Sequence, residues 1–267
     1  MTKEDRKQGK LFIVGIGPGD IQQMTGAVKQ ILQTSEVIVG YRTYTDLIQE
    51  LLEHQEVIST GMGGEIKRCH LAINAARDGK QVAMVCSGDP GVYGMAGLVH
   101  EILAAEDTLA DFPVEVLPGV PALCAAAALL GAPLMNDFAS ISLSDLLTPW
   151  EVIAKRLEAA SQGDFVIILY NPRSRKRTEP LIQAQQIISQ YRKPDTPVGI
   201  VTNAYRGESQ VTLTNLRQMR QQEVGMRTII LVGNSSTFLS GDRMVTPRGY
   251  DNKYNLSPVM RGQDGIK

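Results

Sequence analysis

The stretch Ser87–Gly94, with the sequence SGDPGVYG, decides the fold of this 267-residue chain, because the apolar run Val82–Cys86 leads directly into it. Such a run is typical of a buried parallel strand. Pro90 cannot donate a ladder hydrogen bond, and glycines allow backbone conformations that other residues avoid, so the chain must turn there. In an open α/β sheet, ligands bind at the turns that follow the carboxyl ends of strands. The stretch predicts either a ligand-binding turn or a plain tight connection.

The composition is that of an ordinary soluble globular protein, with 43% hydrophobic and 21% charged residues. The net charge is −1, so we expect neither nucleic acid nor an anionic membrane as a partner. The first ten residues are polar, and no apolar run reaches the roughly 18 residues of a membrane span, which predicts a cytoplasmic location. The three cysteines and three histidines are scattered. They predict neither a disulfide framework nor a metal site.

The segments around the turn alternate between strand and helix patterns. Leu11–Val14 predicts a first strand, which leads into the turn Gly15–Asp20. This turn departs from a dinucleotide fingerprint because Asp20 occupies the third glycine position and Pro18 interrupts it, so we do not expect a nicotinamide enzyme. The other predicted helices are 27–32 with Thr25 as N-cap, 66–76, 98–103, 122–130, 151–160 and 180–191, and the other predicted strands are 37–39, 114–117, 165–170, 198–202, 209–213 and 228–232.

The alternation weakens between Leu134 and Trp150, so we place a domain boundary near this stretch. The expected fold class is α/β with two domains, 10–133 and 134–250, followed by a polar tail, 251–267. Two loops have open interpretations. The glycine-rich segment 60–65 is either a connector or a substrate-facing loop, and the basic run of Arg173, Arg175, Lys176 and Arg177 is either a solvated face or an anion contact.

Five motifs, taken in this order, give the chain a resemblance to a known family. They are VGIGPGD at 14–20, SGDPGVYG at 87–94, PGVPA at 118–122, LYNP at 169–172 and VGN at 232–234. The set resembles the tetrapyrrole methylases, S-adenosylmethionine-dependent enzymes of the corrin and sirohaem pathways, over residues 11 to about 250. The resemblance implies the tetrapyrrole methylase fold, two α/β domains with the active site in the trough between them, and a homodimer.

Further motifs resemble one branch of that family. GYRTY at 40–44, STGM at 59–62 followed by Glu65, SLSDLLTPW at 142–150 and YNPRS at 170–174 are similar to members that methylate carbon 17 of a corrin precursor. The substrate implied is precorrin-3B or cobalt-factor III, whose ring contracts as carbon 20 is extruded, in cobalamin biosynthesis. A methylase of another macrocycle position, a diphthine-synthase-like protein methylase and a non-catalytic adenosyl-binding scaffold remain alternatives.

The resemblance also implies site residues. Cofactor contacts, largely through backbone groups, fall on Pro18, Ser87, Gly88, Asp89, Val92, Pro121, Ala122, Asn171, Ala204 and Asn234, of which the last three are expected on the adenine side. Many relatives carry Ser or Thr where Pro121 stands, so the hydroxyl is missing from that position. Because the macrocycle bears many carboxylates, we expect Arg173 and Arg175 to contact the substrate, together with Tyr41 and Met62.

The chemistry implied by the resemblance has two parts. Methyl transfer from a sulfonium is an in-line displacement that depends on placement, which agrees with a sequence lacking a Ser-His-Asp or Cys-His constellation. Ring contraction requires the carbon-20 hydroxyl to lose a proton, and so it requires an acid or base. Asp20 is the first candidate, with Glu65 and Asp145 as the other carboxylates in motif loops. The alternative for Asp20 is a structural role, capping the backbone near Gln22 or Gln23.

Overall fold

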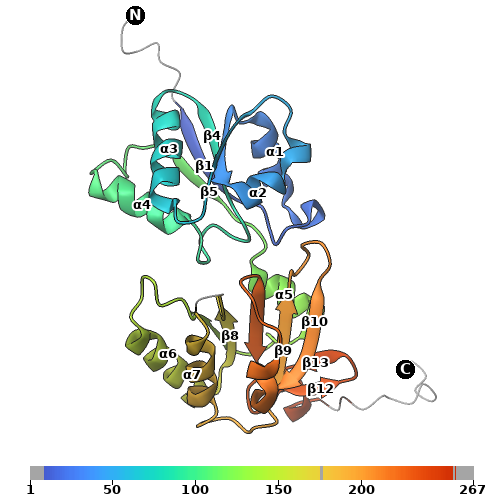
Figure 1. Ribbon diagram of the computed structural model, residues 1–267. Coiled ribbons are helices and arrows are strands. Elements are labelled where there is room, and N and C mark those ends of the chain that lie inside the picture. The colour runs from blue at the N-terminus through green and yellow to red at the C-terminus, as the bar shows by residue number, and fades with distance from the viewer. Residues whose placement is uncertain (1–8, 175–176, 255, 257–267) are drawn as a thin grey trace, which may run out of the picture. The chain divides into compact units, whose positions relative to one another are not determined.

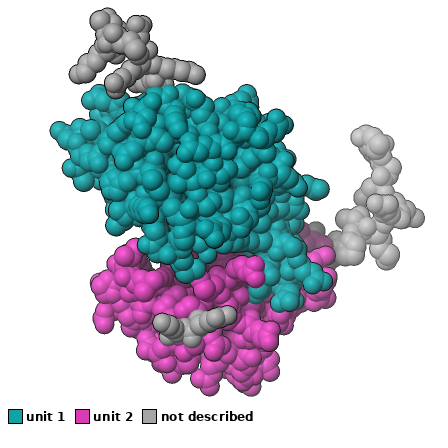
Figure 2. Space-filling model, turned by 45° about the horizontal axis from the view of Figure 1, so that its top comes forward, with its two compact units in different colours: residues 1–129, 201–211 teal, residues 130–200, 212–267 magenta. Residues whose placement is uncertain are grey.

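The computed structural model in Figure 1 describes residues 9–174, 177–254 and 256. Contacts divide the chain into two compact units, which Figure 2 shows in different colours. Unit 1 comprises residues 1–129 and 201–211, and unit 2 comprises residues 130–200 and 212–267. The boundary that we expect at residues 133 and 134 stays a prediction. In the part of the chain that the structure describes, no helix is long and apolar enough to cross a membrane.

Unit 1 is built on a five-stranded sheet with the order β3-β2-β4-β1-β5, and its paired strands run parallel. The strands are β1 (Lys10–Gly15), β2 (Val37–Tyr41), β3 (Glu56–Thr60), β4 (Gln81–Cys86) and β5 (Val114–Leu117). The helices are α1 (Gly26–Thr34), α2 (Arg42–Asp46), α3 (Glu65–Arg77), α4 (Ala96–Ala105) and α5 (Ala122–Leu130), with 3-10 turns at Ile21–Gln23 and Gln49–Leu51.

Side chains on the two faces of this sheet enter separate cores because strand residues alternate in direction. Ile13 and Met84 pack with residues of α3 and α4, whereas Val14 and Val85 pack with residues of α1. The sheet is therefore covered on both faces, as Figure 1 shows. The predicted buried parallel strand is confirmed, since β4 pairs with both β1 and β2 and its residues 82–86 are at most 2% exposed.

Unit 2 holds a second five-stranded sheet with the order β10-β9-β11-β8-β7, except that the end of β9 and the start of β10 fall within the segment 201–211, and a small sheet with the order β12-β13-β6. The large sheet contains β7 (Phe138–Ser142), β8 (Val166–Tyr170), β9 (Pro197–Thr202), β10 (Gln210–Asn215) and β11 (Thr228–Val232), and the small one contains β6 (Gly131–Ala132), β12 (Phe238–Ser240) and β13 (Arg243–Val245). Helices α6 (Trp150–Gln162) and α7 (Glu179–Ile188) share a core with the large sheet, and 3-10 turns occur at Leu216–Gln221 and Tyr250–Asn252.

The two sheets differ in strand direction. In unit 2, β7 pairs with β8 in parallel, but β11 pairs with β8 antiparallel, so that Leu231 lies opposite Ile168. The α/β class is confirmed. The sequence analysis missed the edge strands β3 and β7 and the short strands of the small sheet. Of the tail predicted at 251–267, residues 251–254 and 256 are described and the others lie outside the described residues.

Candidate cofactor and substrate site

The turn after β4 is joined to the turn after β1 by backbone hydrogen bonds. The Gly17 amide donates to the Gly88 carbonyl oxygen at 3.2 Å, and the Gly88 amide donates to the Gly17 carbonyl oxygen at 2.7 Å. Both glycines have positive φ, +74° and +68°, which glycine adopts without strain. The Gly88 amide is therefore engaged within the protein. Its carbonyl oxygen keeps a second lone pair, so a ligand can meet this residue from the carbonyl side.

The Asp89 carboxylate connects two loops of unit 1. Its Oδ1 accepts from the Gly91 amide at 2.8 Å, and its Oδ2 accepts from the Gly119 amide, beyond β5, at 3.0 Å. The backbones also approach closely, since a Cβ at Gly119 would lie 2.2 Å from the Gly88 oxygen and 2.5 Å from the Gly15 oxygen. The carboxyl ends of β1, β4 and β5 are thus fixed against one another. Asp89 links the loops after β4 and β5, and the Gly17–Gly88 hydrogen bonds link the loops after β1 and β4.

Seven of the predicted cofactor residues lie on these three loops: Pro18, Ser87, Gly88, Asp89, Val92, Pro121 and Ala122. A Cβ at Gly88 would be 3.6 Å from Pro121 Cα and 3.7 Å from the Ala122 nitrogen, so the turn after β4 faces the start of α5. The first amides of a helix lack intrahelical acceptors and suit a carboxylate. The loops therefore fit a ligand that combines backbone contacts with a carboxylate group.

The structure does not bring Asn171 and Asn234 together. Because the neighbouring strands β8 and β11 are antiparallel, the residues that follow them lie at opposite ends of this strand pair. Six residues separate the two positions along the strands, which corresponds to about 20 Å at roughly 3.3 Å per residue. The expectation that they share one adenine site is therefore wrong. Asn234 is 6% exposed, and its Oδ1 accepts from the Ser236 amide and hydroxyl and from the Thr237 hydroxyl. The sequence alone does not reveal the direction of β11.

Ala204, the third residue expected beside adenine, belongs to the segment 201–211 that is grouped with unit 1. It is buried between Asn203 and Tyr205, which both have positive φ, +54° and +51°. A bulky residue such as Tyr205 rarely adopts this conformation, so the surrounding contacts must impose it.

Asn171 organises the adjoining ends of β7 and β8. It has a φ of +50°, and its Nδ2 donates to the Ser142 hydroxyl at 3.0 Å. Arg177 donates to the carbonyl oxygens of Asn171, at 3.1 Å, and of Leu143. This part of the basic run therefore holds the two loops of unit 2 in place.

The other members of the basic run differ from Arg177. Arg173 is half-buried in the loop after β8, whereas Arg175 and Lys176 lie outside the described residues. Asp145 is exposed, and its Oδ1 lies 3.7 Å from Arg177 Nε. Asp145 therefore belongs to the same loop arrangement in unit 2.

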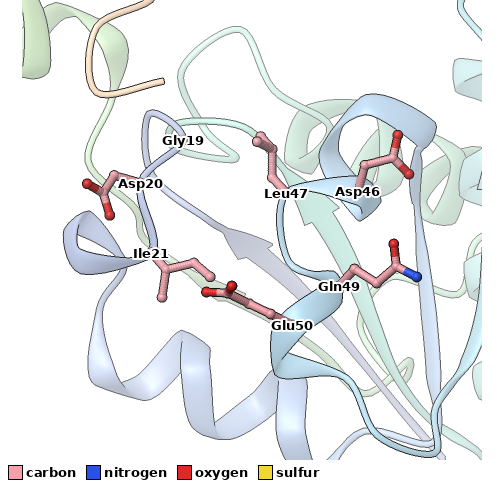
Figure 3. Close-up of a pocket in the computed structure, with 7 residues that line it drawn as sticks. All are labelled: Gly19, Asp20, Ile21, Asp46, Leu47, Gln49 and Glu50. Carbon is pink, nitrogen blue, oxygen red and sulfur yellow. The ribbon is translucent and has the colours of Figure 1, made fainter. Parts of the chain in front are cut away.

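Asp20 is exposed and its Oδ1 accepts from the Gln22 amide at 2.8 Å, which is the capping geometry weighed above as its structural alternative. It also lines a cavity of about 430 Å³ with two further carboxylates, Asp46 and Glu50 (Figure 3). The remaining lining residues are Gly19, Ile21, Leu47 and Gln49. Because this lining carries three acidic groups and no basic one, the cavity itself does not favour an anionic ligand.

The two candidate carboxylates of unit 1, Asp20 and Glu65, lie on separate loops. Glu65 is exposed at the start of α3, beyond β3, whereas Asp20 follows β1. Two strands separate β1 from β3 in the sheet, which places the two loops about 14 Å apart at roughly 4.8 Å per strand spacing. Asp145 belongs to unit 2. Asp20 and Glu65 therefore cannot act as a directly coupled pair.

The predicted substrate residues Tyr41 and Met62 lie on neighbouring strand ends of unit 1. Tyr41 ends β2, and Met62, 68% exposed, follows β3. The Tyr41 ring meets the Tyr44 ring edge-on at 5.2 Å between centroids. Burial raises the pKa of Tyr44, and the guanidinium of Arg206, 5.7 Å from its ring, acts in the opposite direction. Tyr44 is therefore a neutral phenol beside a cation.

Arg68 is a residue that the sequence analysis missed. It is 4% exposed, and its Nε donates to the Thr60 hydroxyl at 2.8 Å while its Nη2 donates to the Gly61 carbonyl oxygen at 3.2 Å. The available signal was its spacing, since Arg68 stands four and eight residues before Ala72 and Ala76 on the apolar face of α3. A charged residue in that position indicates a buried cation.

The chain belongs to the family described as Tetrapyrrole (Corrin/Porphyrin) Methylases, whose model matches residues 10–220. It is 51% identical to the cobalt-factor III methyltransferase of Priestia megaterium over 94% of this chain, but it spans only 47% of that relative. It is 48% identical to the probable cobalt-factor III C(17)-methyltransferase of Salmonella typhimurium, covering 90% of this chain and 99% of the relative.

A solved structure, that of the methyltransferase CobJ, has the same fold, with a TM-score of 0.84 and 35% identity over 90% of this chain and all of that one. The predicted family and the predicted tetrapyrrole methylase fold are confirmed.

Proposed function

We propose that this chain is an S-adenosylmethionine-dependent methyltransferase acting at carbon 17 of cobalt-factor III, with ring contraction, in cobalamin biosynthesis. The observation that carries the proposal is the 48% identity with the Salmonella relative over 99% of that relative's length. The relatives at 48% and 51% identity are both named for cobalt-factor III, which favours the cobalt-bearing substrate over its metal-free counterpart, precorrin-3B.

The proposed cofactor site is the junction of the loops after β1, β4 and β5. S-adenosylmethionine, the methyl donor of this family, supplies an electrophilic methyl group when bound. Gly88, Val92 and Pro121 would hold the donor largely through backbone and van der Waals contacts, and the α5 amides beginning at Ala122 would meet its carboxylate. Asp89 would keep these loops in register. Holding the methyl donor in one position next to the substrate carbon lowers the barrier to methyl transfer.

The proposed substrate residues are Tyr41 and Met62 of unit 1 and Arg173 of unit 2. A corrin precursor carries several carboxylates, whereas the chain has a net charge of only −1, so attraction must come from local cations. The half-buried Arg173 is one such cation among the described residues. Arg175, proposed with it, lies outside them.

Asp20 stays the first candidate for the proton transfer of ring contraction, ahead of Glu65 and Asp145. The change Asp20→Asn is a clean test because an Asn oxygen can still accept from the Gln22 amide and preserve the turn. We expect a loss of roughly 10²-fold or more in the contraction rate, with cofactor affinity unchanged, measured by following the tetrapyrrole absorbance. A wild-type contraction rate in this variant would assign Asp20 to capping alone, and Glu65→Gln and Asp145→Asn would then be compared.

The experiment that tests the function uses purified protein with S-adenosylmethionine and either cobalt-factor III or precorrin-3B. We expect one methyl group to be added at carbon 17 of the cobalt compound with a contracted ring, as established by mass spectrometry and nuclear magnetic resonance. A methyl group at another carbon would identify a different tetrapyrrole methylase, and turnover only on a protein acceptor would favour the diphthine-synthase-like alternative.

The resemblance further leads us to propose a homodimer, and the cytoplasmic location expected from the sequence stays a prediction. Sedimentation of the purified chain at micromolar concentration tests the dimer, and a monomeric mass would contradict it.

A further inference from the structure

Arg68 joins three strand ends of unit 1. Its Nε and Nη2 contact Thr60 and Gly61 at the end of β3, as described above, and its guanidinium lies 5.8 Å from the Tyr41 ring at the end of β2. Its Nη1 is 3.8 Å from the sulfur of Met95, which directly follows the turn after β4. One side chain therefore touches the elements that carry both the proposed substrate residues and the proposed cofactor turn.

The partners of this guanidinium are all neutral. They are a hydroxyl, a carbonyl oxygen, a thioether and an aromatic ring, and none of the ion pairs among the described residues includes Arg68. The nearby titratable groups do not neutralise it either, since burial raises the pKa of the Cys86 thiol to about 12 and raises the pKa of the Tyr44 phenol. Among the described residues, no carboxylate therefore lies within ion-pair distance of this charge, although Glu65 stands three residues earlier on α3.

A buried charge without a counter-charge is costly, and folds normally pair it or replace it by an apolar residue. An apolar residue such as leucine or methionine in this position of α3 would avoid the cost of a buried charge. Keeping an arginine makes physical sense if a ligand provides the opposite charge at these strand ends. The polycarboxylate macrocycle of the proposed function has that chemistry.

We propose that Arg68 is a positioning residue for the tetrapyrrole substrate: it holds Tyr41 and the loop that carries Met62 in their binding arrangement, and its charge is balanced by the substrate's carboxylates. The inference rests on the proposed function. Arg68 acts through Tyr41, Thr60 and Gly61 rather than on the reacting atoms, so it should affect substrate binding more than the chemical step.

The test compares three variants of the full chain. Arg68→Met keeps an unbranched side chain, somewhat smaller than arginine, and removes both the charge and the planar set of N–H donors. Arg68→Lys keeps the charge but loses that planar set of donors. Arg77→Met is the matched control, because Arg77 lies on the same helix but is exposed and paired with Glu106. For each protein we would measure kcat and KM for cobalt-factor III at several ionic strengths, S-adenosylhomocysteine affinity by calorimetry, and the urea midpoint.

We expect Arg68→Met to raise KM about tenfold or more, with kcat and S-adenosylhomocysteine affinity within twofold of wild type, and to flatten the dependence of KM on salt. Arg68→Lys should raise KM by less and keep the salt dependence, and Arg77→Met should change neither. If Arg68→Met does not fold, a raised KM with retained salt dependence in Arg68→Lys still supports the proposal.

Two results would overturn the inference. One is a folded Arg68→Met or Arg68→Lys variant with wild-type KM and salt dependence, and the other is a parallel fall in stability and S-adenosylhomocysteine affinity without a selective rise in KM, which marks a purely structural role. Wild-type protein that does not turn over cobalt-factor III would instead refute the proposed function, and this inference with it.

Discussion

Each unit buries an arginine, but among the described residues only the arginine of unit 2 forms an ion pair with a carboxylate. In unit 2, Arg192 lies 3.2 Å from Asp164 and donates to the carbonyl oxygens of Ser161, at 2.5 Å, and Phe165, at 3.2 Å. Burial lowers the pKa of Arg192, and the Asp164 carboxylate acts in the opposite direction. In unit 1, Arg68 has only neutral partners. The contrast separates an arginine whose charge is paired with a carboxylate of its own unit, although its buried Nε has no hydrogen-bond partner in the described part of the chain, from an arginine whose charge we propose is balanced by a ligand.

The largest expected effect comes from removing the paired arginine. Arg192→Met should lower the free energy of unfolding by about 3 kcal/mol, because two carbonyl groups lose their donor and the ion pair is lost. It should leave KM for cobalt-factor III unchanged. Urea denaturation and steady-state kinetics measure the two quantities.

The control for this change is Arg243→Met, which removes the exposed pair with Asp242 in the same unit and should cost at most about 1 kcal/mol. A selective rise in KM in Arg192→Met would remove the distinction between the two arginines.

A smaller effect is expected at the turn after β4. Gly88→Val places a β-branched residue at a φ of +68°, which should cost about 2 kcal/mol of stability. A Cβ there meets only ordinary contacts, so the backbone rather than a clash sets this cost. We also expect weaker S-adenosylhomocysteine binding by calorimetry, since the added methyl groups stand at the proposed cofactor turn.

Gly97→Ala in α4 is the matched control, because a Cβ at Gly97 has no neighbour within 4 Å and alanine favours a helix. It should cost nothing. Unchanged cofactor affinity in a folded Gly88→Val protein would show that the cofactor does not bind at this turn. It would also weaken the proposal that unit 1 binds a ligand at these strand ends.

The smallest effect concerns pH. Burial raises the pKa of Cys86 from 9.0 to about 12, against smaller lowering by the Met95 backbone and by Arg68. The unfolded thiol therefore ionises first, so this contribution to stability is complete below pH 9 and is lost as the pH rises from 9 toward 12. At pH 9 the loss is roughly 0.4 kcal/mol.

Urea midpoints between pH 7 and 10 test this, with Cys86→Ala expected to decline less steeply than wild type. Arg68→Met should raise the pKa of Cys86 further, because the positive charge of Arg68 favours the thiolate of Cys86. An equal pH slope in wild type and Cys86→Ala would mean that other groups govern the alkaline range.

The strands with the clearest sequence patterns are largely buried on both faces, although the partly exposed edge strands β5 and β10 were also predicted. β1, β4 and β11 contain continuous apolar runs, and they were found because such runs are typical of strands with most of their residues buried. β3 and β7 are edge strands whose sequences, EVIST and FASIS, mix apolar and polar residues, and Val57 and Phe138 are exposed. No strong periodicity marks such strands.

The site residues were predicted only in part, because a sequence pattern shows neither the direction of a strand in its sheet nor the burial of a side chain. Seven cofactor residues fall on three adjoining loops because parallel strands place their carboxyl ends at one edge of a sheet. Asn234 was misplaced because strand direction is a property of pairing, not of composition. Arg68 was missed because the predicted helix 66–76 was defined by its apolar residues alone, and the burial of a charged residue among them shows only in the structure.

The segment 201–211 determines how the chain can be divided into separately expressed fragments. It is grouped with residues 1–129, and a Cβ at Gly19 would lie 2.8 Å from the Cβ and Cγ of Arg206 within that unit. No single truncation therefore yields either unit whole. A fragment ending at residue 129 would lack the segment whose Arg206 contacts Gly19 and Tyr44. An isolated unit 1 therefore requires residues 201–211 to be joined to residue 129 through a linker.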